Sequence, residues 1–259
     1  MPQPSATKRL GSPFVELQSV DSTNNYARQQ IHAGLAQHGT VFFAHEQVAG
    51  KGQRGKIWTT EKGSNLILSL VVKPQPLLLA QQFQLSACVA VAIHEFFMKY
   101  AGDNTKIKWP NDLYWQDRKA GGVLIENIVR GQEPAPGNRE WISIIGIGIN
   151  INQTSFDPEI KNPVSLKQIT GKPFDPVELA KELCTLLDKR FTELVETGFE
   201  NIFSTYLANL YKRKETVKLK KGSQVFEALI EGVSPTGKLI TQHSIGEEFG
   251  FGEVEWVIK

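Results

Sequence analysis

The sequence predicts an α+β protein in which a mainly antiparallel sheet packs with helices on one face, followed by a small C-terminal β domain. Strand-like runs over 105–115, 120–129 and 141–151 follow one another through short or polar connections. Such connections join antiparallel neighbours, because a parallel crossover needs about a dozen residues or more. Toward the C-terminus, short β-rich runs alternate with Gly and Pro turns, which is typical of a small barrel. We therefore predict two domains, 1–212 and 213–259.

The N-terminal half contains two predicted helices and two buried strands. Residues 21–25 (DSTNN) are typical of helix N-caps, and the helix that they start ends at Gly34. Apolar runs over 40–47 and 65–72 predict the strands. The second helix is predicted over 81–100, where apolar residues recur at helical spacing.

Two more helices are predicted before the C-terminal domain. Asp175 is a typical N-cap, Pro176 suits the first turn and Glu178 the third position, so a helix begins there. Its apolar side continues to Gly198, which ends it. A further helical run covers 199–210.

Composition and charge exclude several classes of function. Lys and Arg total 29 and Asp and Glu 27, so the net charge of +2 does not suit a protein that mainly coats nucleic acid. The first 14 residues lack the apolar run of a secretory signal, and no stretch approaches the roughly 18 apolar residues that span a bilayer. We therefore expect a cytoplasmic protein without a membrane partner. Residues 1–20 are too few for a helix-turn-helix domain, so no DNA partner is expected.

The cysteines and histidines do not predict a metal site. Cys88 and Cys184 lie far apart in apolar helical patterns, which is typical of buried thiols in a reducing compartment. The five histidines show no spacing typical of metal ligands. No protein-ligated metal is therefore expected.

The loop AGKGQRGKIW, residues 49–58, combines three glycines with three cations. Glycine lets backbone amides approach a ligand, and Lys51, Arg54 and Lys56 add positive charge, so the loop suits an anion. Its spacing fits neither a Walker loop nor the GxGxxG turn of a dinucleotide-binding fold. From the loop alone, a ligand-binding role and an ordinary basic surface loop remain equally open.

The run KIKWPNDLYWQDRKAGGVLIEN, residues 106–127, contains a second candidate site. Pro110 interrupts the strand, so Asn111 and Asp112 lie at a turn where their side chains can bond backbone or ligand. Taken alone, this turn is typical of a structural hairpin. The lysine and glycine pair that follow, over 119–122, favour a binding role.

The third candidate is GIGININ, residues 146–152, where glycines alternate with isoleucines at the period of a strand. One face would carry only glycines and asparagines, and we expect a ligand or another backbone to fill it. Close packing of the strand on a helix would explain the glycines, but it explains Asn150 less well.

These three stretches, together with DSTN, resemble biotin protein ligases (biotin–acetyl-CoA-carboxylase ligases) of the short class without an N-terminal DNA-binding domain. The resemblance covers nearly the whole chain, since the C-terminal segment is similar to the family's SH3-like domain. It implies a fold of the class II aminoacyl-tRNA synthetase and biotin ligase type. It also implies that the first domain uses ATP and Mg²⁺ to join biotin to a lysine of a biotin carboxyl carrier protein through biotinyl-5′-AMP. A homodimer is compatible with the resemblance.

The resemblance implies which residues bind biotin. Hydrogen bonds to the neutral ureido ring would come from Ser22, Thr23 and Gln47, set in an otherwise apolar pocket. The residues implied to contact biotin are Ser22, Thr23, Asn24, Gln47, Lys51, Gly52, Gln53, Lys119, Gly121 and Gly122.

Catalytic roles are implied for Lys119, Asp112 and Arg54. A carboxylate and a triphosphate repel each other, and Lys119 would neutralise both, with Arg54 as a second cation. For Asp112 two roles stay open: orienting Lys119 and the Mg²⁺, or accepting a proton from the carrier lysine. The residues implied to contact ATP or the adenylate are Lys51, Arg54, Trp58, Trp109, Asn111, Lys119 and Asn150.

The glycine-rich loop departs from the family pattern GRGRRGR at two informative positions. Gln53 replaces an arginine that helps family members hold the adenylate, and Lys51 replaces a bidentate donor with a point charge. We therefore expect a leakier intermediate. The alternative function is ligation of lipoate or octanoate on the same fold, although the R-R-x-S-G-G-G-type motif of those relatives is not visible.

Overall fold

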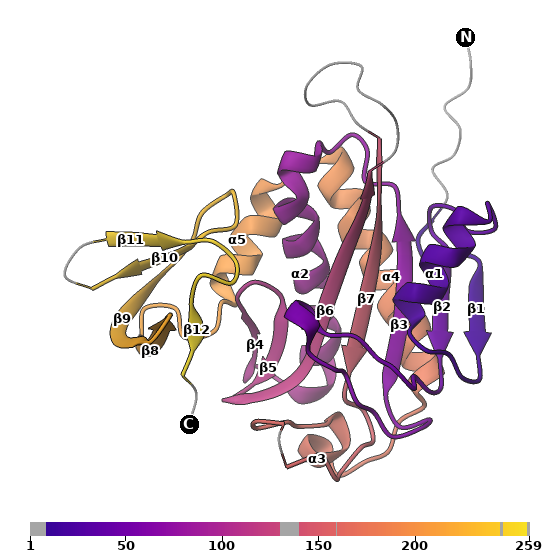
Figure 1. Cartoon of the computed structure of the whole chain (residues 1–259), viewed down its shortest axis with the longest axis horizontal. Coiled ribbons are helices and arrows are strands. Elements are labelled where there is room, and N and C mark those ends of the chain that lie inside the picture. The colour runs from indigo at the N-terminus through magenta and orange to yellow at the C-terminus, as the bar shows by residue number, and fades with distance from the viewer. Residues whose placement is uncertain (1–8, 130–139, 159, 244–245, 258–259) are drawn as a thin grey trace.

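The computed structural model describes residues 9–129, 140–158, 160–243 and 246–257. A seven-stranded sheet with helices on both faces forms most of the molecule, and a five-stranded sheet from the C-terminal segment lies beside it (Figure 1). Both the N-terminal residues 1–8 and most of the predicted polar connection before Trp141 lie outside the described residues. The α+β class predicted from sequence is confirmed.

The large sheet is antiparallel except at one edge, where β1 runs parallel to β2. The sequence did not predict β1, while the antiparallel order of the remaining strands agrees with the short connections between them. Pro110 divides the predicted run over 105–115 into two strands. In spatial order the strands are β1 (Phe14–Leu17), β2 (Val41–Ala44), β3 (Leu66–Val72), β7 (Trp141–Ile149), β6 (Arg118–Val129), β5 (Asp112–Trp115) and β4 (Thr105–Lys108).

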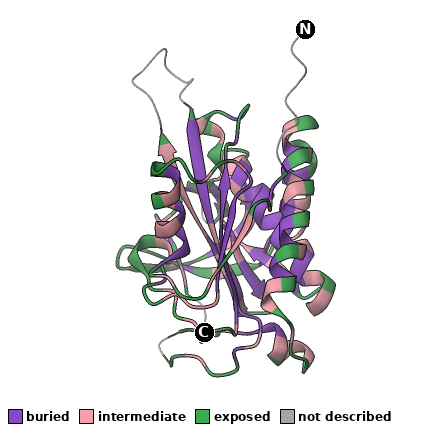
Figure 2. Cartoon of the chain, turned by 90° about the vertical axis from the view of Figure 1, so that its right-hand side faces the viewer, coloured by how far each residue is buried: buried purple, intermediate pink, exposed green. Residues whose placement is uncertain are grey.

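One face of the sheet is covered by two long helices, α2 (Gln82–Ala101) and α4 (Pro176–Glu196), together with α5 (Glu200–Ala208) and the short α3 (Leu166–Thr170), which both lie beside α2. Alternate residues of β3, such as Leu68 and Leu70, are buried in this main core. Figure 2 shows the buried residues running along the strands and the inner sides of the helices.

The opposite face of the sheet is covered by α1 (Thr23–His32). Ala27 and Ile31 pack there against Phe42, Val71 and Ile144 in a second, smaller core. The prediction that helices lie on one face only is therefore wrong for α1. The strands over which α1 lies are apolar on both sides, as strands buried between two layers are.

The C-terminal segment forms a separate antiparallel sheet whose own apolar side is buried, with Leu219, Ile230 and Leu239 fully covered. It contacts the first sheet where the Trp109 indole Nε1 donates a hydrogen bond to the Gly237 carbonyl at 2.9 Å. Its strands in spatial order are β11 (Gly246–Phe249), β10 (Leu239–Gln242), β9 (Gln224–Val233), β8 (Thr216–Lys221) and β12 (Glu255–Trp256).

Both cysteines are free thiols in the main core, as predicted. Burial raises the pKa of both, that of Cys184 to about 12, so neither is a thiolate at neutral pH. No helix within the described ranges is both long and apolar enough to cross a membrane.

The start of α4 illustrates how the sequence sets a helix boundary. The Asp175 carboxylate accepts hydrogen bonds from the backbone N–H groups of Val177 and Glu178 at 2.8 and 3.3 Å. These two donors have no partner within the helix, so the side chain satisfies them.

We expect Asp175→Ala to lower the free energy of unfolding by about 1 kcal/mol, which is the usual value of an N-cap, and the Tm by about 2–4 °C. Urea and thermal unfolding followed by circular dichroism would measure both. Asp103→Ala, at an exposed turn residue, is the matched control and should change stability by less than about 0.5 kcal/mol. Equal effects of the two substitutions would contradict the role of the cap.

Candidate functional site

An ion pair on the face of β5 and β6 is the centre of the candidate site. The Lys119 Nζ lies 2.8 Å from Asp112 Oδ2, and the two side chains are 31% and 19% exposed. A Cβ at Gly122 would lie 3.1 Å from Asp112 Oδ1 and 3.3 Å from Lys119 Nζ. Glycine at position 122 therefore gives this pair the space that it occupies.

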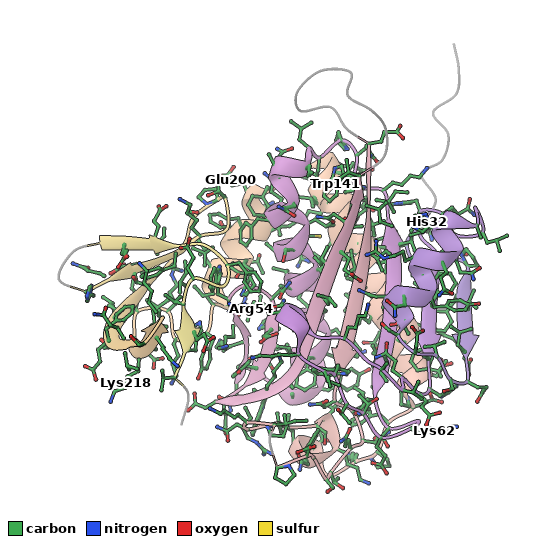
Figure 3. The ribbon with its side chains drawn as sticks, viewed as in Figure 1. His32, Arg54, Lys62, Trp141, Glu200 and Lys218 are labelled. Atoms are coloured by element: carbon green, nitrogen blue, oxygen red, sulfur yellow. The ribbon has the colours of Figure 1, made fainter. Side chains whose placement is uncertain are left out.

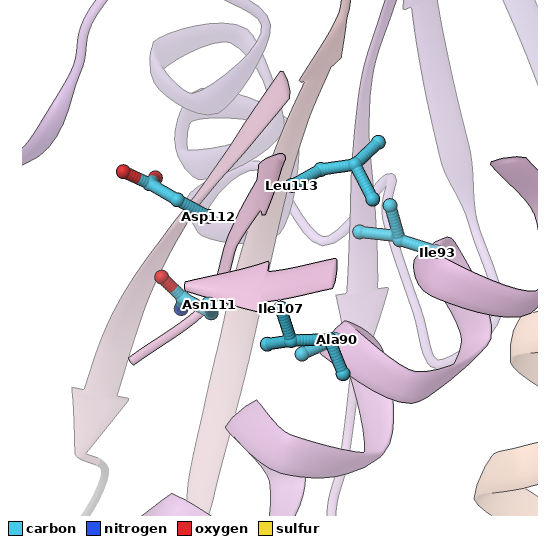
Figure 4. A pocket seen from close by; sticks show the side chains of 6 residues that line it. All are labelled: Ala90, Ile93, Ile107, Asn111, Asp112 and Leu113. Atoms are coloured by element: carbon cyan, nitrogen blue, oxygen red, sulfur yellow. The ribbon is translucent and has the colours of Figure 1, made fainter. Parts of the chain in front are cut away.

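The face of β5 that packs against α2 has no space for a ligand. Figure 4 shows Asp112 and Asn111 turned to one side, while Leu113 and Ile107 face Ala90 and Ile93 of α2. The recess between these residues has no room for a water molecule. A ligand of the Lys119–Asp112 pair must therefore bind on the face away from α2.

A second group of polar residues lies at the start of α1. The Thr23 backbone N–H and Oγ1 both donate to Gln47 Oε1, at 2.7 and 3.0 Å, and Ser69 Oγ donates to Thr23 Oγ1 at 2.8 Å. Ser22 is at the N-cap position and buried, yet its side chain makes no capping bond. Capping therefore does not account for Ser22, and Ser69 joins the predicted residues as one that sequence reasoning missed.

Asn24 connects this group to β6. Its Nδ2 donates to Glu126 Oε2 at 2.8 Å, and its Oδ1 accepts from Ser69 Oγ at 2.6 Å. Arg28 pairs with the other oxygen of Glu126 at 3.0 Å. Glu126 was also not predicted; the available signal for it and Ser69 is a polar residue within an otherwise apolar strand.

The glycine-rich loop folds back as a narrow hairpin. Trp58 N–H donates to the Gly50 carbonyl at 2.9 Å, and at the tip Arg54 has a φ of 57°. The Gln53 amide Nε2 donates to Asn111 Oδ1 and to the Val123 carbonyl, both at 2.8 Å. Gln53 therefore fastens the tip of the loop to the strands that carry the Lys119–Asp112 pair.

Two of the three loop cations, Lys51 and Arg54, have partners away from that pair. Lys51 Nζ donates to Asn25 Oδ1 at 2.6 Å, beside α1. Arg54 Nη1 lies 3.8 Å from Glu255 Oε1 of the C-terminal sheet, and Figure 3 places Arg54 between the two sheets. In this arrangement Lys119 is the predicted cation that pairs with Asp112.

The glycine face of β7 is filled by side chains. A Cβ at Gly146 would lie 2.4 Å from Asn24 Oδ1, and one at Gly148 would lie 2.6 Å from Trp58 Cε2. Side chains rather than another backbone therefore occupy this face, and the approach of Asn24 from α1 to Gly146 is the close packing of the strand on a helix that was the alternative. The Trp58 indole Nε1 is buried without a hydrogen-bond partner, so it has an unused donor at the site.

Two predicted adenylate contacts have partners within the protein. Trp109 is buried and faces the C-terminal sheet, with its ring 6.1 Å from that of Phe251. Asn150 follows the end of β7 and donates through Nδ2 to the Val164 carbonyl at 3.2 Å. Asn111 lies closer to the ion pair and donates to Ser86 Oγ at 3.0 Å.

An open cleft of about 510 Å³ separates the loop from β6. This volume is typical of small-ligand sites. Its walls combine exposed apolar side chains, two lysines and the Glu126 carboxylate. The lining residues are Val48, Ala49, Gly50, Lys51, Gly52, Gly55, Lys56, Ile57, Leu124 and Glu126. In the described part of the chain, no three His, Cys, Asp or Glu side chains gather as metal ligands.

Comparison with known proteins places this chain in a family. Residues 16–139 match the model of the biotin/lipoate A/B protein ligase family. The biotin--[acetyl-CoA-carboxylase] ligase of Paracoccus denitrificans is 31% identical over 238 residues, which cover 90% of this chain and 95% of that protein. The bifunctional ligase/repressor BirA of Bacillus spizizenii is 31% identical over 199 residues, 76% of this chain, and this chain spans 59% of its length.

The fold of a solved structure leads to the same family as the sequence comparison. The biotin protein ligase from Aquifex aeolicus, in complex with biotin and ATP, superposes with a TM-score of 0.79 at 25% identity and covers 96% of this chain and 100% of that one. The chain therefore belongs to the biotin/lipoate A/B protein ligase family. Within it, the similarity described here is to biotin ligases, in sequence and in fold.

We expect Gly146→Ala to lower the free energy of unfolding by about 1–3 kcal/mol, because the added methyl group displaces Asn24 from Ser69 and Glu126. Gly232→Ala is the matched control, since its Cβ would meet nothing nearer than Leu207 Cδ2 at 3.7 Å. Denaturant unfolding measures both.

A double-mutant cycle with Asn24→Ala tests the cause of the Gly146→Ala effect. Removing the Asn24 amide should recover part of the loss, since the two positions share one contact. Strict additivity would show that the methyl group acts through another neighbour.

Proposed function

We propose that this chain is an ATP-dependent ligase that joins biotin to a specific lysine of a biotin carboxyl carrier protein through biotinyl-5′-AMP. The observation that carries the proposal is the Lys119–Asp112 pair over Gly122, on the sheet face that the glycine-rich loop approaches. Family membership supports it, together with the named activity of the Paracoccus denitrificans relative.

The first step needs a cation between two anions. A biotin carboxylate oxygen attacks the α-phosphorus of ATP, the bond to pyrophosphate breaks, and negative charge builds on the phosphoryl oxygens. The Lys119 ammonium, oriented by Asp112, would stabilise that charge. Mg²⁺ would arrive with the triphosphate and screen it, and the described residues around Lys119 offer it Asp112 as a carboxylate neighbour.

The biotin ring needs a few fixed hydrogen-bonding groups in an otherwise apolar pocket. Ser22, Thr23, Ser69 and Gln47 provide such groups around the start of α1, and the last three are already held by one another. We assign the ureido ring to this group of residues. Gln53, which reaches Asn111 and Val123, would then lie near the acyl phosphate of the intermediate.

Ligation of lipoate or octanoate remains the alternative, because the matched family includes lipoate ligases. The hydrogen-bonding group around Gln47 favours a polar ring over an alkyl chain. A homodimer and a cytoplasmic location are further parts of the proposal, and we assign no DNA partner.

Incubation with ATP, Mg²⁺, labelled biotin and a biotin carboxyl carrier domain should label the carrier. Transfer of labelled lipoate instead would overturn the proposal.

Lys119→Ala should lower adenylate formation at least about 1,000-fold, since it removes the cation at the site of developing charge. Lys62→Ala is the control, because Lys62 pairs with Glu46 on the exposed surface and should leave the rate unchanged. Full activity of Lys119→Ala would refute the assigned role.

We expect Gln53→Arg to slow dissociation of biotinyl-5′-AMP by about tenfold, because arginine offers a charged, bidentate donor to the phosphate. Release of labelled adenylate from the native chain and from the variant, chased with unlabelled intermediate, measures the rate. Gln53→Met, which removes the amide but keeps the length, should speed release. An unchanged rate in the arginine variant would count against the expected leak.

A further inference from the structure

Lys108 lies on the same sheet face as the Lys119–Asp112 pair. In the register of β4 and β5, Lys108 is opposite Asp112, and in that of β5 and β6, Tyr114 is opposite Lys119. Ile107, between Lys106 and Lys108, is buried against α2, so the two lysines face the other way. Strand pairing therefore puts Lys108 beside the two residues proposed to act in the reaction.

The Lys108 amine contacts two aromatic rings. Its Nζ lies 5.2 Å from the ring centre of Tyr114 and 5.4 Å from that of Trp256 in the C-terminal sheet. The Tyr211 ring lies 5.1 Å from that of Tyr114 and 5.7 Å from that of Trp256. Within the described residues, the Lys108 amine has no hydrogen bond or salt bridge, so its lone pair is not engaged when it is neutral.

Asp112 is less suited than Lys108 to take a proton. Its carboxylate already accepts from the Lys119 ammonium at 2.8 Å, which favours the orienting role among the two that were open. A general base also works best when its own pKa lies near the pH at which the reaction runs.

From this cluster we propose that Lys108 is the general base of the second step. The inference rests on the proposed function. The carrier lysine ammonium gives one proton to the neutral Lys108 amine, and its nitrogen then attacks the carbonyl carbon of biotinyl-5′-AMP. The new C–N bond forms, the C–O bond to the phosphate breaks, and AMP leaves with that electron pair. The second nitrogen proton passes to water as the amide forms.

The electrostatic surroundings of Lys108 support this role. Burial is the main cause that lowers the pKa of Lys108 to about 8; Asp112 opposes the change, while Lys119 and Lys56 add to it. Tyr114, which also faces Lys108, has a pKa raised by burial and stays neutral. A lysine with this pKa is about one-tenth neutral at pH 7, whereas an ordinary lysine with a pKa of about 10.4 is almost fully charged.

The test separates the two steps. Adenylate formation is measured from biotin and ATP alone, and transfer is measured in single turnover with preformed biotinyl-5′-AMP and a carrier domain. Lys108→Met should lower transfer about 100-fold while adenylate formation changes less than about threefold. Lys108→Arg keeps the charge and the aromatic contacts but cannot act as a base at neutral pH, so it should lose transfer to the same extent. Lys106→Met, on the same strand and face, is the matched control and should transfer normally.

The pH dependence of the transfer rate of the native chain tests the same proposal without a substitution. The base must be neutral, so the transfer rate should fall about tenfold per pH unit below about pH 8 and level off above it. In Lys108→Met that break should vanish. Recovery of transfer in Lys108→Arg, equal loss of both steps in Lys108→Met, or no break near pH 8 in the native profile would each overturn the inference. Intact adenylate formation in the same samples would leave the proposed function standing.

Discussion

The absence of side chains at three glycine positions on two central strands is the constraint on which the rest of the site depends. Gly122 of β6 pairs in register with Gly148 of β7, and Gly146 lies one pleat further along the same strand. Each leaves space that another segment enters: the Lys119–Asp112 pair over Gly122, Trp58 over Gly148 and Asn24 over Gly146. The surface of the site is thus shaped by glycines of β6 and β7, while side chains from α1, β5, β6 and the loop supply its chemistry.

The WPND turn joins this surface to the C-terminal sheet. Trp109 bonds to Gly237 on one side of the turn, while Asn111 and Asp112 face the loop and the ion pair on the other. Lys108, just before the turn, contacts Trp256. The C-terminal sheet is therefore in contact with the strands that carry the proposed reaction, rather than appended to a complete site.

Periodicity and end signals predicted the long elements well, because these depend on nearby residues. The helix that begins after Asp175 and ends before Gly198 follows from its own sequence, as does the strand that stops at Lys73. The four-residue strand β1 was not predictable, since its pairing partner lies elsewhere in the chain. The apolar run of β3 could not tell which face α1 covers, because both of its faces are buried.

The site residues also divide into those that local motifs predicted and those whose contacts depend on distant parts of the chain. The motifs identified Lys119, Asp112 and the glycines, since these act where the backbone puts them. The positions of the Lys51 and Arg54 side chains were not predictable in this way. They depend on Asn25 and Glu255, which are distant in sequence. Tertiary structure, rather than local pattern, decides such contacts.

The two fastenings of the loop tip differ in their response to ionic strength. Arg54 and Glu255 are both more than half exposed and 3.8 Å apart, so dissolved salt screens their attraction, which is worth less than about 1 kcal/mol. The bonds from Gln53 to Asn111 and Val123 are between neutral groups, and salt acts on them only weakly. As salt rises, the loop should therefore loosen from the C-terminal sheet while it remains attached to the strands of the site.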